Sequence, residues 1–89
     1  MDNILNEIKE ERIRQIKKFA DKNSGLSLSA FLSILTEEVG EAAKDINDIN
    51  LGSKRKNLFG HLRIELVQVA ATAVQIIEHL DKQYLNTEN

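Results

Sequence analysis

The segment from about His61 to Tyr84 most constrains the fold, because it is apolar around most of a helical circumference. Five of its polar side chains form one narrow strip on a helical wheel: Glu65, Gln68, Thr72, Gln75 and His79. A helix that is apolar on most sides has to be buried on most sides, and a chain of 89 residues has little material to cover it. We therefore expect a homo-oligomer, most simply a two-fold dimer.

Two more helices are predicted upstream of this segment. The first covers roughly residues 2–22, where apolar residues recur at helical spacing before a glycine-containing break. The second begins near Ser27 or Ser29 and runs to about Asn50 with one continuous apolar stripe. Gly40 inside this helix costs about 1 kcal/mol relative to alanine. It indicates either the close approach of another helix or ligand, or a small residue that is simply tolerated.

A basic loop follows at residues 51–57, with room for one short helical turn before Gly60. No stretch of the sequence shows the alternation typical of strands, and there are no internal repeats. We expect a single all-α domain over residues 1–89, with three main helices that form a helical bundle in the oligomer.

Composition excludes several classes of function. The net charge of −2 argues against non-specific nucleic-acid binding, which needs a basic surface. The sequence contains no cysteine, so disulfides and thiolate metal sites are excluded. Neither a secretory signal nor a membrane-spanning segment is recognisable, and a cytoplasmic protein that does not bind membranes is the expectation.

Two short acidic clusters carry the functional signal. Glu38 and Glu41 are three residues apart on the second helix, and Glu65 and Gln68 have the same spacing on the third. Side chains at this spacing are neighbours on a helix surface. If the two helices pack antiparallel, three carboxylates and one amide face each other, and such oxygen-rich sites suit Mg²⁺. The competing interpretation is that these are ordinary acidic pairs on solvated helix faces, and Glu37 in particular points away from the apolar stripe.

The sequence Leu35-Thr36-Glu37-Glu38-Val39-Gly40-Glu41, followed 24 positions after Glu41 by Glu65-x-x-Gln68, resembles the MazG-like nucleotide pyrophosphohydrolases of the all-α NTP pyrophosphatase superfamily. That family carries a Glu-Glu-x-x-Glu motif and, after a variable spacer, Glu-x-x-Asp. The stretches at residues 11–18 and 65–71 also look like small MazG-like proteins, and the resemblance covers roughly residues 10 to 82.

The resemblance implies a helical dimer, or a dimer of dimers, with a four-helix catalytic core that binds Mg²⁺, for which Mn²⁺ is a possible substitute. It implies hydrolysis of nucleoside triphosphates between the α- and β-phosphates. Glu38, Glu41 and Glu65 would be metal ligands, together with Gln68, and Glu38 would belong to the catalytic centre. Glu37 would orient or deprotonate the attacking water.

Gln68 departs from the family motif, which more often has aspartate there. Its carbonyl oxygen can still face Mg²⁺ or a bound water, but it brings no negative charge. The site would then bind metal more weakly, use Asp45 instead, or have lost activity. Two alternatives therefore stay open: a non-catalytic helical module that senses nucleotides or binds a protein, and a structural dimer whose carboxylates pair with Arg63 and lysines.

Phosphates need positively charged or amide partners. The candidates are Arg14, Gln15 and Lys18 on the first helix, which match the family's basic stretch, and Lys54 and Lys56 in the loop. The competing interpretation is that these residues are solvated or paired with neighbouring glutamates. His61 and His79 are poor metal-ligand candidates, because neither belongs to a Glu-x-x-His arrangement.

Overall fold

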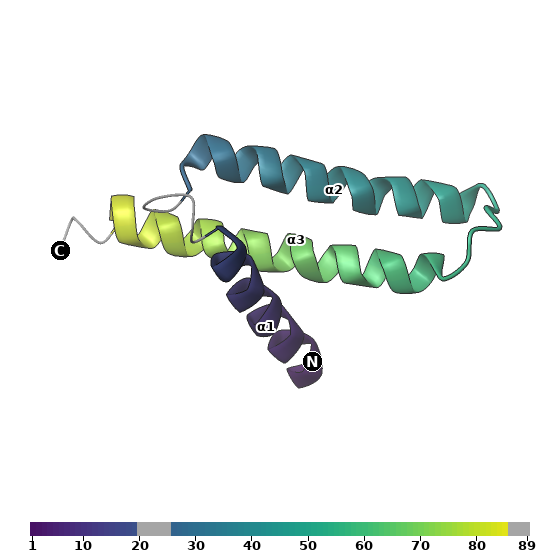
Figure 1. Ribbon diagram of the computed structural model, residues 1–89, viewed down its shortest axis with the longest axis horizontal. Helices are drawn as coiled ribbons and strands as arrows, with labels where there is room; N and C mark the ends of the chain where they lie inside the picture. The colour runs from purple at the N-terminus through teal and green to yellow at the C-terminus, as the bar shows by residue number, and fades with distance from the viewer. Residues whose placement is uncertain (20–25, 86–89) are drawn as a thin grey trace.

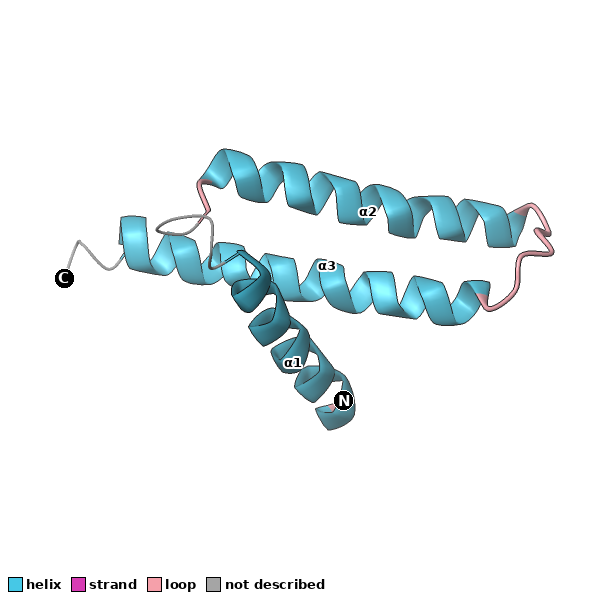
Figure 2. Ribbon diagram, in the orientation of Figure 1, coloured by secondary structure: helices cyan, strands magenta, loops and turns pink. Residues whose placement is uncertain are grey.

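The computed structural model describes residues 1–19 and 26–85, and all regular structure in these ranges is helical (Figure 2). The helices are α1 (Asp2–Phe19), α2 (Leu28–Asn50) and α3 (Leu58–Leu80), which a short π-helical segment, η1 (Asp81–Leu85), extends. The prediction of an all-α chain with three main helices is confirmed for these residues. The predicted end of the first helix, at residues 20–22, and the break after it lie outside the described residues.

The start of α2 confirms the sequence prediction, and the start of α3 corrects it. Ser27 caps α2, since its hydroxyl oxygen accepts a hydrogen bond from the backbone N–H of Ala30 at 3.1 Å. α3 begins at Leu58, three residues before the predicted start. Asn57 adopts a left-handed conformation with φ of 59°, which asparagine tolerates, so the chain turns directly into the helix. Gly60 therefore lies within the first turn of α3 and does not interrupt it.

α2 and α3 form an antiparallel pair, and α1 crosses α3 near the middle of its length (Figure 1). Two ion pairs connect α1 with α3, between Arg12 and Glu78 and between Arg63 and Glu7, and each has a closest N–O distance of 2.6 Å. α3 therefore packs against α1 on one side and against α2 on another.

The single chain has a small core, and part of the circumference of α3 remains exposed. Within residues 1–19 and 26–85, the buried hydrophobic residues are Phe31, Ala42, Leu58 and Ala71. The polar strip of α3 faces inward instead, since Thr72 and Gln75 are buried while Leu66 and Ile77 are 48% and 57% exposed. One chain thus leaves part of α3 uncovered, and the burial expected in an oligomer stays a prediction.

Some of the exposed hydrophobic side chains align along α2 and α3. On α3, Phe59, Leu66 and Ile77 are spaced by seven and eleven residues, close to two and three helical turns, and fall opposite the polar strip. On α2, Leu32, Val39 and Ile46 repeat every seven residues on the flank away from the acidic residues. We refer to these six residues as the apolar face.

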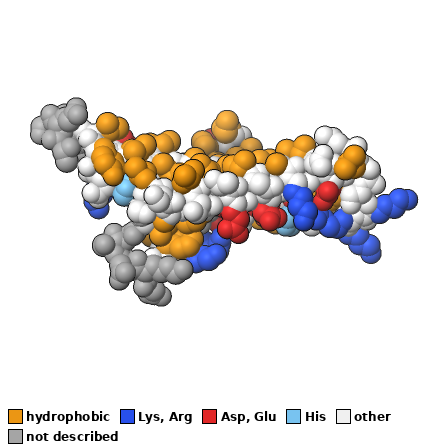
Figure 3. All heavy atoms as spheres, turned by 90° about the horizontal axis from the view of Figure 1, so that it is seen from above, with side chains coloured by type: hydrophobic (Ala, Val, Ile, Leu, Met, Phe, Trp, Pro, Cys, Tyr) orange, Lys and Arg blue, Asp and Glu red, His pale blue; other side chains and the backbone are white. Residues whose placement is uncertain are grey.

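Figure 3 views the molecule from the α2 side, where hydrophobic side chains extend along its length and acidic side chains gather in one group beside them. Basic side chains cluster at the end that carries the α2–α3 loop. Among the described helices, none combines the length and the apolarity needed to cross a membrane.

Candidate functional site

A cavity of about 520 Å³ lies where the three helices meet, and residues of both acidic motifs line it. The lining residues from the motifs are Glu37, Glu38, Glu41, Glu65 and Gln68. From α1 the cavity receives Arg14, Gln15 and Lys18, and Phe19 and Ile34 complete the lining. Residues from three separate stretches of the chain, which the sequence singles out for metal and phosphate binding, thus share one cavity.

Lys54 and Lys56 do not belong to this group. Both are exposed in the loop between α2 and α3, and neither lines the cavity of its own chain. Arg63 is also elsewhere, because its guanidinium pairs with Glu7 on α1 and not with the acidic motifs. The structural alternative therefore loses one of its proposed ion-pair partners.

Antiparallel packing explains why the acidic residues converge. Glu38 lies one turn before the buried Ala42, so its side chain leaves α2 at the edge of the α2–α3 contact. Glu65 and Gln68, one turn apart on the inward strip of α3, leave that helix on the same flank. Glu38, Glu65 and Gln68 are half-buried, whereas Glu37 and Glu41 are exposed at the rim.

The cavity carries an excess of negative charge. Burial raises the pKa of Glu65, and the negative charges of Glu41, Asp45 and Glu38 raise it further, while His61 acts in the opposite direction. A cation in the cavity would relieve this repulsion. In the ranges 1–19 and 26–85, no three His, Cys, Asp or Glu side chains are grouped closely enough to hold a metal ion as they stand.

On the α1 side, Arg14 forms a two-pronged ion pair with Glu11, with Nε–Oε1 and Nη2–Oε2 distances of 2.8 and 2.6 Å. This pair lowers the pKa of Glu11 and raises the pKa of Arg14, to which the negative charge of Glu38 also contributes. The Arg14 side chain is 54% exposed, so one face of its guanidinium is open to a ligand. Lys18 lies one turn further along α1 and is exposed.

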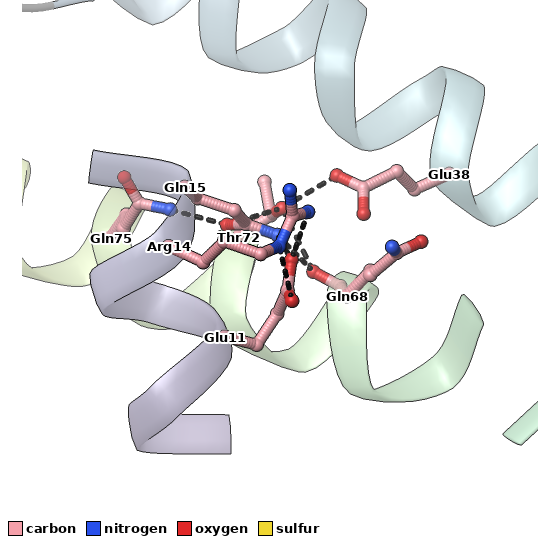
Figure 4. Close-up of polar contacts among 7 residues, drawn as sticks. All are labelled: Glu11, Arg14, Gln15, Glu38, Gln68, Thr72 and Gln75. Atoms are coloured by element: carbon pink, nitrogen blue, oxygen red, sulfur yellow. Dashed lines mark hydrogen bonds and ion pairs between the residues drawn. The ribbon is translucent and has the colours of Figure 1, made fainter. Parts of the chain in front are cut away.

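Gln15 is deeply buried, with 4% exposure, and its side-chain amide is hydrogen-bonded to other groups of the chain (Figure 4). Its Nε2 donates to Glu11 at 3.0 Å and to the backbone carbonyl of Gln68 at 3.3 Å. Its Oε1 accepts from the Nε2 of Gln75 and faces the hydroxyl of Thr72 at 3.3 Å. A direct contact of Gln15 with phosphate stays a prediction, and it would require one of these bonds to open.

Beside the cavity lies a second polar cluster that the sequence did not indicate. The Asp45 carboxylate is 1% exposed and contacts Arg55 Nη2 at 2.6 Å and His61 Nδ1 at 2.5 Å. The bond to His61, with help from Arg55, lowers the pKa of Asp45 against the effect of burial. Asp45 is therefore engaged by Arg55 and His61 and does not line the cavity, and its use in place of the missing charge at Gln68 stays a prediction. The Nε2 of His61 lies 3.7 Å from Glu65 Oε1 and links this cluster to the cavity.

No protein-family model, curated protein or solved structure matches the chain. The resemblance of its motifs to MazG-like enzymes therefore rests on the sequence motifs alone.

Proposed function

We propose that this chain is a Mg²⁺-dependent nucleoside triphosphate pyrophosphohydrolase, which produces a nucleoside monophosphate and pyrophosphate. One observation carries the proposal: a single cavity is lined by the carboxylates of both acidic motifs and by basic residues of α1. The competing interpretation, ordinary acidic pairs on solvated helix faces, does not predict that both pairs line one cavity opposite basic residues.

The donor chemistry suits a hard divalent cation, because the side chains are oxygen donors and because burial, followed by the neighbouring negative charges, raises the pKa of Glu65. Since the carboxylates are not grouped closely enough as they stand, they would have to move closer together around the ion. Glu38, Glu41 and Glu65 would hold Mg²⁺, with the Gln68 amide oxygen as a neutral fourth group. Bound there, the cation supplies charge neutralisation of the polyphosphate and polarisation of the scissile phosphorus.

The chain's own residues perform the remaining steps. Arg14 and Lys18, on the α1 wall, bind phosphate oxygens and orient the triphosphate. Glu37 at the rim orients the attacking water in line with the leaving pyrophosphate or accepts its proton.

We further propose that the active form is a homodimer that pairs through the apolar face. The chain exposes 6695 Å², and a folded monomer of this size exposes about 5,300 Å². The excess of roughly 1,400 Å² per chain exceeds the ~800 Å² that each partner contributes to a standard interface. Two α2–α3 pairs facing each other would give the four-helix core that the motif resemblance implies.

The test is pyrophosphate release from a panel of canonical and modified ribo- and deoxyribonucleoside triphosphates, with Mg²⁺ and with Mn²⁺. Glu38→Gln and Glu41→Gln should abolish turnover without loss of helicity. Glu10→Gln, a matched change at an exposed residue of α1 that does not line the cavity, should leave it intact. An inactive wild type across the whole panel, or full activity in both cavity variants, would refute the proposal.

Gln68 favours one second candidate, a catalytically degenerate module that senses nucleotides. Because Gln68 lacks the negative charge of an aspartate, the cavity would bind a nucleotide and its cation without hydrolysing the bond between the α- and β-phosphates. Titration calorimetry combined with the same panel separates the two functions. Nucleotide binding with no pyrophosphate release assigns the sensor, and binding followed by turnover assigns the enzyme.

A further inference from the structure

A chain of hydrogen-bonded polar side chains occupies the middle of the small core, where hydrophobic residues would be expected. Thr72 is 1% exposed, and Gln15 and Gln75 are 4% and 9% exposed. Burial of such groups is costly unless each is hydrogen-bonded. In the described part of the chain, every buried side-chain nitrogen and oxygen atom has a partner, so the network is complete.

The network ends on a carboxylate of the cavity. The Thr72 hydroxyl has one proton, and three oxygens lie within its reach: Glu38 Oε1 at 2.7 Å, the Gln68 carbonyl at 2.9 Å and Gln15 Oε1 at 3.3 Å. The charged acceptor is also the nearest, and charge-assisted bonds are the shortest and strongest of this kind.

The other two acceptors have donors of their own. The Gln68 carbonyl accepts from Gln15 Nε2, and Gln15 Oε1 accepts from Gln75 Nε2. The amide of Gln15 is held in this orientation because its nitrogen faces two acceptors, Glu11 and the Gln68 carbonyl. The network therefore leaves the Thr72 proton for Glu38 (Figure 4).

We infer that Thr72 is a positioning residue for the metal site of the proposed function, on which this inference rests. Thr72 holds one carboxylate oxygen of Glu38, so the other oxygen is presented to the cation in a fixed direction. Gln15 and Gln75 act one step further out by keeping the Thr72 hydroxyl directed at Glu38. A flexible glutamate on a helix flank would otherwise lose rotational freedom each time a cation binds.

The experiment compares Thr72→Val, which keeps the branched shape and removes the hydroxyl, with Thr72→Ser, which keeps the hydroxyl. Mn²⁺ binding to the full chain is measured by the loss of its free-ion paramagnetic resonance signal, alongside circular dichroism and pyrophosphate release. Thr36→Val is the control, because Thr36 is exposed and its hydroxyl donates to the Leu32 carbonyl of its own helix.

Loss of a residue that orients a metal ligand typically weakens metal affinity 10- to 100-fold. We expect Thr72→Val to bind Mn²⁺ at least about tenfold more weakly than the wild type with unchanged helicity. Thr72→Ser should restore most of the affinity, and Thr36→Val should match the wild type. A purely structural role of Thr72 would lower the melting temperature and leave the affinity of the folded protein unchanged.

Gln75→Met provides a second route if Thr72→Val does not fold. It leaves Thr72 in place but deprives Gln15 Oε1 of its donor, so this oxygen competes with Glu38 for the Thr72 proton and Mn²⁺ affinity should fall. Wild-type affinity in the folded variants overturns the inference while the proposed function stands. A wild-type chain that neither binds Mn²⁺ nor releases pyrophosphate overturns both.

Discussion

Ile77→Gln tests whether the apolar face is an interface between two copies of the chain. The Ile77 side chain is 57% exposed on α3, and full burial of an isoleucine stabilises by about 1.5–3 kcal/mol. Covering the exposed part would contribute roughly 1–1.5 kcal/mol per copy, and a two-fold dimer contains two copies. The substitution should therefore raise the dimer dissociation constant roughly 30- to 150-fold.

Sedimentation velocity over a concentration series measures this constant, and circular dichroism verifies the fold. In an isolated chain the same change would be neutral or slightly favourable, because glutamine is a better helix former than isoleucine. Lys44→Gln, at an exposed polar position of α2, is the control and should leave the constant unchanged. A wild type that stays monomeric at all concentrations, or an Ile77→Gln variant that dimerises like the wild type, would refute the reasoning.

Three further predictions concern stability in denaturant or heat. Gly40→Ala should stabilise by up to about 1 kcal/mol in urea unfolding, because a Cβ there meets nothing within 4 Å in the described chain; a loss of stability would instead place Gly40 against a partner. Gly52→Ala should destabilise by about 1 kcal/mol, since Gly52 has φ of +76°. The raised pKa of Glu65 means that the folded chain holds this proton more tightly than the unfolded chain, so stability falls as pH rises above the usual carboxyl range. In thermal unfolding with a chelator present, Glu65→Gln should reduce this loss of stability with rising pH. The same substitution should remove the stabilisation by Mg²⁺. An unchanged pH dependence of the melting temperature would contradict the raised pKa of Glu65.

The helices were predictable because local patterns determine them. The apolar stripe and the serine cap fix α2 from Ser27 onward, and the structure confirms both. The start of α3 was missed because Gly60 suggested a break. A glycine in the first turn of a helix costs little when the preceding Asn57 already sets the turn, and sequence patterns do not reveal that conformation.

The acidic residues of the cavity were predictable for a similar reason, since i,i+3 spacing on two helices that pack antiparallel brings side chains together. Contacts that depend on tertiary packing were not. Thr72 and Gln75 stood out as polar residues in an apolar helix, but only the position of α1 shows that they bond to Gln15 and, through Thr72, to Glu38. The Asp45–Arg55 pair connects α2 to the α2–α3 loop, and nothing in the sequence spacing of these two residues indicates it.

The two opposite flanks of α3 have different roles, and activity should depend on both of them. Its polar strip faces the cavity, and Leu66 and Ile77 on the other side belong to the apolar face, so a partner that covers this face leaves the cavity open. In the part of the chain that the structure describes, four hydrophobic residues are buried, which is a small core to hold α3 against α2. The positions of Glu38 and Glu65 across the cavity would then depend on the partner even though no partner residue needs to enter it. Turnover per chain should rise with protein concentration as the dimer forms, and Ile77→Gln should shift this rise to higher concentration. Turnover that stays constant across the range in which the dimer dissociates would show that one chain alone holds the site together.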